Sequence, residues 1–363
     1  MLIVRSPVRI SFGGGGTDLP AYYEQFGGAV VSAAINKYFY TVLGARTDGR
    51  IQVISSDLRV FESWQDIATM PIQDSELEIP LAVLKDLGCK AAVDLFLASE
   101  IPPGTGLGSS ASVCVNILKT LTSYQQQPLS KYELAEQAFH IARDVLHKHV
   151  GKQDEYAAAF GGLNYISFHQ DGSTQVDSLN LDPVILRELQ SNLLLFFTGS
   201  AHHSWTILRE QEASTRAQSF STLDALHEVK ALALRMRQAL ESGQLQLFGE
   251  LLHEVWEAKR RISSKISNSR IDELYAIARR EGALGGKITG AGGGGFLLLY
   301  CESSRRQAVR EALLAQGIQE MVFAFEMQGA QVIVNDPFID GDEKGGSRWV
   351  FVPTTANASS TGR

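Results

Sequence analysis

A glycine-rich loop at residues 103–111, Pro-Gly-Thr-Gly-Leu-Gly-Ser-Ser-Ala, is the part of this sequence best suited to chemistry. Glycines let a backbone approach a ligand closely, and a helix that begins at Ser109 would present unpaired N–H groups and its positive dipole end. A plain strand-to-helix turn needs fewer glycines. The loop therefore predicts a nucleotide phosphate site formed by Pro103, Gly104, Thr105, Gly106, Leu107, Gly108, Ser109, Ser110 and Ala111.

Two common phosphate-binding patterns do not fit the rest of the chain. A Walker A loop needs Gly-Lys followed by serine or threonine, but Gly286-Lys287 is followed by Ile288. Residues 290–295 match the spacing of a dinucleotide-binding fingerprint. The apolar run 296–300 that follows them predicts a strand, where the fingerprint needs a helix.

The glycine motifs, taken together, resemble those of the GHMP kinases, the family of galactokinase, homoserine kinase, mevalonate kinase and phosphomevalonate kinase. Residues 103–111 are similar to the phosphate loop of that family, and residues 287–295 resemble its third motif. Arg5-x-Pro-x-Arg9, followed by residues 13–18, resembles its first motif. The motifs occur in the family's order, and the resemblance covers residues 1–335.

Within the family, the chain is most similar to D-glycero-α-D-manno-heptose 7-phosphate kinases, at residues 14–20, 28–32 and 150–162. The resemblance implies an α+β fold of two domains, the first like domain 2 of ribosomal protein S5 and the second ferredoxin-like. It implies that the γ-phosphoryl group of ATP is transferred, with Mg²⁺, to a hydroxyl of a sugar or sugar phosphate. The best match is the heptose 7-phosphate, which would give the 1,7-bisphosphate.

The resemblance also implies roles for single residues. Asp154 would accept the proton of the acceptor hydroxyl, Arg9 would pair with Asp154, and Ser110 would hold the metal ion. Without the resemblance, the favoured interpretation of Asp154 is a solvated carboxylate at a helix start, and that of Asp18 is an N-cap residue at the start of a helix at 18–26. The implied substrate-binding residues are Gly15, Gly16, Thr17, Asp18, Gly151, Gly290, Ala291 and Gly292.

Two positions depart from the family pattern. The family has a glutamate that helps to hold Mg²⁺ twelve residues before the catalytic aspartate, and this chain has Ala142 there. Asp144 is near, but two residues along an α-helix rotate a side chain by about 200°. Either the helix shifts locally, or the ion depends on Ser110, nucleotide oxygens and water. His202 stands where heptose-phosphate relatives tend to carry an arginine, so recognition of a substrate phosphate could differ, unless this is simply an exposed helix start.

Apolar periodicity indicates the elements that would position these motifs. We expect a first domain at 1–188, a second at 189–339 and a disordered tail at 340–363. The first domain would contain strands at 2–9, 30–35, 38–45, 51–55 and 91–98, helices at 109–124 and 133–147, and a hairpin at 163–168 and 175–179. The second would contain strands at 193–197, 286–289, 296–300, 321–325 and 331–334 and helices at 203–219, 223–241, 245–262, 271–281 and 304–316.

Bulk composition narrows the class of protein. The chain has 363 residues, a formal net charge of -7 and no basic block, so neither nucleic acid nor a membrane is an expected partner. Its three scattered cysteines fit a reduced, cytoplasmic setting. Besides the heptose-phosphate kinase, a GHMP kinase for a hexose or uronic acid stays open. So does a ligand sensor with weak catalysis, which Ala142 suggests and the intact Asp154, Arg9 and Ser110 disfavour.

Overall fold

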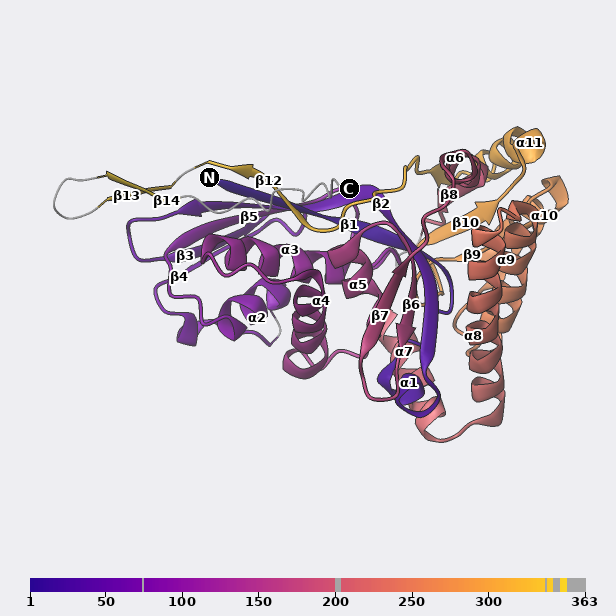
Figure 1. Cartoon of the computed structure of the whole chain (residues 1–363), viewed down its shortest axis with the longest axis horizontal. Coiled ribbons are helices and arrows are strands. Elements are labelled where there is room, and N and C mark those ends of the chain that lie inside the picture. Colours follow the sequence, from indigo (N-terminus) through magenta and orange to yellow (C-terminus); the bar gives the residue numbers. More distant parts are fainter. Residues whose placement is uncertain (74, 200–203, 337, 342–346, 351–363) are drawn as a thin grey trace, which may run out of the picture.

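The structure, a computed structural model, describes residues 1–73, 75–199, 204–336, 338–341 and 347–350. Two α+β domains lie side by side, each built on its own sheet (Figure 1). This confirms the expected fold class. Within the described part, no helix is long and apolar enough to cross a membrane.

The sheet of the first domain has eight strands in the order β12-β1-β2-β5-β3-β4, with β6 joined to β2 and β7 joined to β6. The strands are β1 (Leu2–Gly13), β2 (Gly28–Ala45), β3 (Ile51–Ser55), β4 (Val60–Trp64), β5 (Val93–Ser99), β6 (Leu163–Phe168), β7 (Thr174–Ser178) and β12 (Gln331–Asn335). β2 is one strand where the sequence predicted two. Its pairing with β1 skips residues 36 and 37, so the strand bends there and pairs with β6 before the bend and β5 after it.

Helices α2 (Glu78–Asp86), α3 (Ser109–Tyr124), α4 (Lys131–His140) and α5 (Gln153–Phe160) lie on one face of this sheet (Figure 1). The helix predicted at 133–147 is interrupted. A capping box of Ser130 and Glu133 begins α4, but α-helical geometry stops at His140, and Ile141–Val145 form a π-helical turn. This wider turn borders the site described below.

The second domain has a four-stranded antiparallel sheet in the order β11-β8-β10-β9. Its strands are β8 (Leu193–Phe197), β9 (Gly285–Ile288), β10 (Phe296–Tyr300) and β11 (Gln319–Glu320). Its helices are α6 (Pro183–Asn192), α7 (Ser204–Arg216), α8 (Phe220–Glu241), α9 (Leu245–Arg260), α10 (Ser269–Glu281) and α11 (Ser303–Leu314). The strand predicted at 321–325 is wrong, because β11 ends at Glu320 and only Phe325 forms a bridge, to Ile35 of the first domain.

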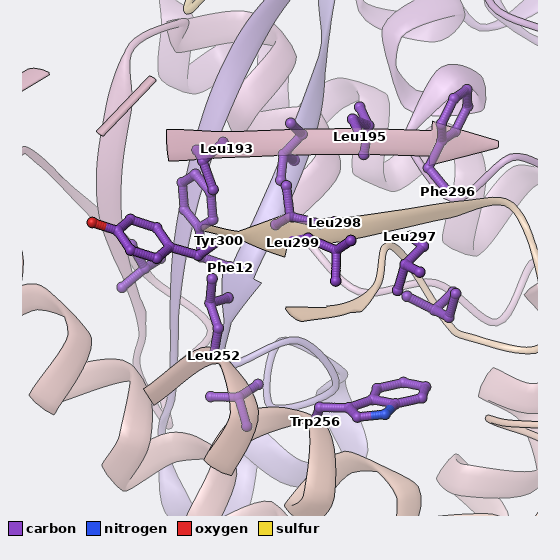
Figure 2. Close-up of a cluster of buried hydrophobic side chains, with 14 of the residues drawn as sticks. Phe12, Leu193, Leu195, Leu252, Trp256, Phe296, Leu297, Leu298, Leu299 and Tyr300 are labelled. Carbon is purple, nitrogen blue, oxygen red and sulfur yellow. The ribbon is translucent and has the colours of Figure 1, made fainter. Parts of the chain in front are cut away.

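The hydrophobic core is continuous across the two domains. Phe12, near the end of β1, lies among side chains of β8, β10 and α9 (Figure 2), and its ring centroid is 5.3 Å from that of Phe248. The chain also returns to the first sheet, since β12 pairs with β1 and not with the second domain as predicted. Part of the tail expected to be disordered is instead paired, because β13 (Phe338–Gly341) and β14 (Ser347–Val350) pair with each other. Residues 342–346 and 351–363 lie outside the described part.

Candidate active site

A cavity of about 430 Å³ lies between the two domains and is lined by residues of both. Cavities of this size hold small-molecule substrates and cofactors. All of the predicted site residues line it except Thr17, Thr105, Leu107 and Gly292. The fold thus brings the first glycine motif, the phosphate loop, the segment around Asp154 and the third glycine motif to one place.

The phosphate loop owes its shape to three glycines in the left-handed region. The φ angles of Gly104, Gly106 and Gly108 are 74°, 81° and 75°, which other residues rarely adopt. Gly108 is the N-cap of α3 and supplies no capping side chain. The first N–H groups of the helix, at Ser109 and Ser110, therefore remain available to an anion in the cavity.

The four predicted residues that do not line the cavity shape the loops around it. Thr105 is fully buried and its hydroxyl donates to the carbonyl oxygen of Pro102 at 3.0 Å, while Leu107 belongs to the hydrophobic core. The Thr17 hydroxyl donates to the carbonyl oxygen of Gly14 at 2.8 Å. Gly292 packs against Ile266, where a Cβ would lie 2.9 Å from a side-chain carbon. These four residues stabilise the backbone of the loops and do not line the cavity.

Arg9 joins the phosphate loop to Asp154. Its Nε donates to Asp154 Oδ1 at 2.8 Å, and its Nη1 donates to the carbonyl oxygen of Gly106 at 2.7 Å. Arg9 is 3% exposed, whereas the Asp154 side chain is 27% exposed and lines the cavity. Asp154 is thus no free surface carboxylate at the start of α5. It is fixed by a buried cation beside the anion site.

Asp18 links the first glycine motif to the start of α5. The helix α1 (Pro20–Phe26) begins after Leu19 and has no side-chain cap, so Asp18 is not its N-cap. Its Oδ1 instead accepts the N–H of Gly16 at 2.8 Å, and its Oδ2 accepts the N–H of Gln153 at 3.2 Å. Burial raises the pKa of Asp18, and the charge of Asp154 adds to the increase. A Cβ at position 151 would lie 2.1 Å from Asp18 Oδ2, which explains the glycine there.

The third glycine motif closes the cavity from the second domain. A Cβ on Gly290 would lie 2.6 Å from Gly106 Cα, and a Cβ on Gly106 would lie 2.5 Å from the carbonyl oxygen of Thr289. The two loops can therefore touch only because both positions are glycine. Both domains therefore contribute a glycine-rich loop to the same part of the cavity.

Comparison with known proteins identifies this architecture. The family pattern "GHMP kinases N terminal domain" matches residues 78–162, and "GHMP kinases C terminal" matches residues 236–319. D-glycero-alpha-D-manno-heptose 7-phosphate kinase of Campylobacter jejuni is 30% identical over 332 residues, which span 90% of this chain and 97% of that protein. This chain belongs to the GHMP kinase family.

Solved structures and a second curated relative agree with this GHMP kinase assignment. A structure described as a D-glycero-D-manno-heptose 1-phosphate kinase from Bacteroides thetaiotaomicron is 29% identical, with a TM-score of 0.76, over 91% of this chain and 98% of that one. An L-fucokinase/L-fucose-1-P guanylyltransferase of Bacteroides fragilis is 28% identical over 82% of this chain but only 34% of its own length. Galactokinase of Lactococcus lactis, at 20% identity and a TM-score of 0.72, shares the fold.

In this GHMP kinase, the position expected to carry a metal-binding glutamate faces the site. Ala142, in the π-helical turn, lines the same cavity as Ser110 of the phosphate loop. Asp144 lies on another side of the turn, where its Oδ2 is 2.8 Å from Nδ1 of His140 and its side chain is 62% exposed. Among the described residues, no group of three His, Cys, Asp or Glu side chains could hold a metal ion. An ion here would therefore need ligands from the nucleotide.

The cavity also contains side chains that the sequence motifs did not indicate. Gln211 of α7 donates to the carbonyl oxygen of Gly16 at 3.0 Å, and Lys259 of α9 donates to that of Gly290. Burial raises the pKa of Glu155 well above its usual range, and Asp154 adds to the increase. Glu155 is adjacent to a predicted residue and could have been considered. Gln211 and Lys259 lie on helices without any motif, so no sequence signal pointed to them.

The prediction for His202 cannot be compared with the structure, because residues 200–203 lie outside the described part. Trp205 and Leu208 of α7 line the cavity. These apolar residues line the same cavity as the polar residues Asp18 and Gln211. Such a combination suits the two faces of a sugar ring.

Proposed function

We propose that this protein transfers the γ-phosphoryl group of ATP to a hydroxyl of a sugar phosphate, with D-glycero-D-manno-heptose 7-phosphate as the best candidate acceptor and the 1,7-bisphosphate as product. The observation that carries the proposal is the ion pair of Arg9 and Asp154, which lies next to the phosphate loop in the cavity that both domains line. The free cysteines, buried in the described structure, fit a reducing cytoplasm.

The proposed mechanism follows from what each group can do. The loop 103–108 and the first N–H groups of α3 would bind the nucleotide phosphates. Gly15, Gly16 and Asp18 would orient the acceptor, and Asp154 would accept the proton of its hydroxyl as the new P–O bond forms. Arg9 holds the carboxylate of Asp154 toward the cavity. Phosphoryl transfer depends mostly on such positioning and charge stabilisation.

Mg²⁺ fits this site as a ligand of Ser110, whose side chain lines the cavity in the first turn of α3. When bound, the ion would neutralise charge on the nucleotide phosphates. Mg²⁺ keeps several waters and usually takes one or two protein ligands in such sites, so the absence of a carboxylate at Ala142 is compatible with binding. The same absence predicts a weaker site than a glutamate would give.

The acceptor is inferred from relatives and needs direct measurement. The Campylobacter relative is named for a heptose 7-phosphate, the Bacteroides structure for a heptose 1-phosphate, and the fucokinase relative for a free sugar. A coupled ADP-release assay should compare both heptose phosphates with L-fucose, galactose and galacturonate. We expect turnover with the heptose 7-phosphate. Turnover with a free sugar only would favour the alternative acceptor class, and ATP binding without turnover on any sugar would favour a ligand sensor.

A further inference from the structure

We propose that Lys259, at the end of α9, contacts the γ-phosphoryl group directly and is the second domain's charged contribution to the transfer site. The inference rests on the proposed kinase function and adds a residue outside all three glycine motifs. Lys259 is 6% exposed and lines the cavity. Its Nζ donates a hydrogen bond to the carbonyl oxygen of Gly290.

This bond places the ammonium group beside the phosphate loop. Gly290 is packed so closely on Gly106 that a Cβ on the former would lie 2.6 Å from Cα of the latter. The carbonyl oxygen of Gly106 accepts from Arg9 Nη1 at 2.7 Å, and Arg9 holds Asp154. Lys259, Arg9 and Asp154 therefore surround one loop, the loop to which the proposed function assigns the phosphates.

The balance of charges around Lys259 favours an anionic ligand. An ammonium group has three donors, and the contact with Gly290 uses one of them. A buried cation is costly unless partners compensate it. Asp18 and Asp154 attract Lys259, but Arg9 and the buried Lys287 repel it. A phosphoryl group in the cavity would supply the partner that the protein alone does not.

The environment also predicts a pH signature. Burial lowers the pKa of Lys259 to about 8, and the neighbouring Arg9 adds to the decrease. Lys259 is therefore positively charged in the free protein below about pH 8 and loses its proton above it. If Lys259 binds the γ-phosphoryl group, the preference for a triphosphate over a diphosphate should fall as the pH rises through this range.

The test measures nucleotide binding by calorimetry, which does not require the acceptor to be known. ATPγS and ADP are titrated, with Mg²⁺, into the wild type, Lys259→Met and Lys230→Met. Lys230 is a matched control, since its Nζ also donates to a backbone carbonyl oxygen, that of Phe26 at 2.6 Å, and neither residue lines the cavity. A hydrogen bond to a charged group predicts that Lys259→Met weakens ATPγS binding about 10- to 100-fold and ADP binding less than about threefold. Lys230→Met should change neither.

The outcomes separate the inference from the proposed function. Equal weakening of ATPγS and ADP by Lys259→Met would show that Lys259 only supports the Gly290 loop, and no change would show that it does not reach the phosphate; both overturn the inference. If Lys259→Met does not fold, the same titrations of the wild type at pH 7 to 9.5 test the inference. A preference for ATPγS over ADP that is constant over this pH range also overturns the inference. A wild type that binds neither nucleotide would overturn the proposed function itself.

Discussion

Asp154 and Ala142 show how single side chains determine what this site can do. Arg9 Nε donates a hydrogen bond to Asp154 Oδ1 at 2.8 Å, and Asp154 lines the same cavity as the start of α3. Ala142 faces the same cavity, but its side chain stops at Cβ. The proposed proton acceptor is therefore intact, whereas the proposed metal site lacks one carboxylate.

Replacement of Asp154 by asparagine should reduce turnover by about 100-fold or more, because an amide cannot accept the proton of the acceptor hydroxyl. Nucleotide affinity should change little, since the phosphate loop is untouched. The measurement is steady-state ADP release together with calorimetric nucleotide binding. Asp144→Asn is the control, because the exposed Asp144 contacts His140 and not the cavity. A mutant that retains most of its turnover would exclude Asp154 as the base.

Replacement of Ala142 by glutamate should lower the Mg²⁺ concentration that gives half-maximal activity, because it adds a charged oxygen ligand on a face that already lines the cavity. The measurement is the Mg²⁺ dependence of turnover at saturating ATP. Ala142→Gln matches the size of the new side chain without its charge and should have a smaller effect. An unchanged Mg²⁺ dependence in Ala142→Glu, or a sharply higher requirement in Asp144→Asn, would assign the metal to another side of the π-helical turn.

At the scale of elements, Glu212 connects α7 of the second domain to the segment that precedes Asp154. Its side chain is 3% exposed, and it accepts bonds from Arg143 of the π-helical turn, from Nδ1 of His149 at 2.6 Å and from Arg216 at 3.0 Å. Gln211, its neighbour in sequence, bonds Gly16. One turn of α7 thus contacts both the segment that precedes Asp154 and the first glycine motif.

Glu212→Gln should destabilise the protein by about 3 kcal/mol at pH 7, an upper value, and the effect should disappear in acid. Burial alone would raise the pKa of Glu212, but bonds from Arg143, His149 and Arg216 outweigh it and lower the pKa to about 2. The carboxylate therefore contributes stability above its unfolded pKa near 4.5, and this contribution is lost as the pH falls from there toward 2. Urea unfolding of both proteins at pH 7, 4 and 3 measures the difference. A difference that is constant over this range would contradict the assignment.

At the scale of the whole molecule, the two domains share one core and one active site. Phe12, near the end of β1, packs among side chains of β8, β10 and α9 (Figure 2). After the second domain, the chain returns to the first sheet, where β12 pairs with β1. The cavity depends on both domains, because the phosphate loop of the first domain contacts the third glycine motif of the second domain at Gly290. We expect the domains to unfold together.

Phe12→Ala should lower the free energy of unfolding by about 3–5 kcal/mol, because it leaves a cavity in the shared core. Chemical unfolding followed by far-UV and near-UV circular dichroism should still show one transition, with both signals shifted equally. Phe96→Ala is the control, since Phe96 in β5 is 41% exposed and should contribute much less. Two separated transitions in the mutant would show that the domains are stabilised independently.

The sequence by itself determined the features that depend on a few adjacent residues. Glycines at 104, 106 and 108 specify a left-handed loop before a helix, and the structure has this loop and the start of α3 at the predicted residues. The long helices of the second domain were predicted near their observed ranges for the same reason, since their apolar spacing is local. Asp154 and Arg9 were identified by resemblance to a family motif, and the structure brings them into contact.

Only the tertiary structure decided which side chains from distant segments share the cavity. The contacts of Asp18 with Gln153 and of Lys259 with Gly290 join residues 135 and 31 positions apart, and no local pattern encodes them. The π-helical turn at Ile141–Val145 was missed because the apolar spacing of residues 134–145 equally suits a regular helix. β12 was predicted in the second domain, but it pairs with β1 of the first. The sequence of a segment indicates that it forms a strand, whereas the packing of the whole chain determines which strand it pairs with.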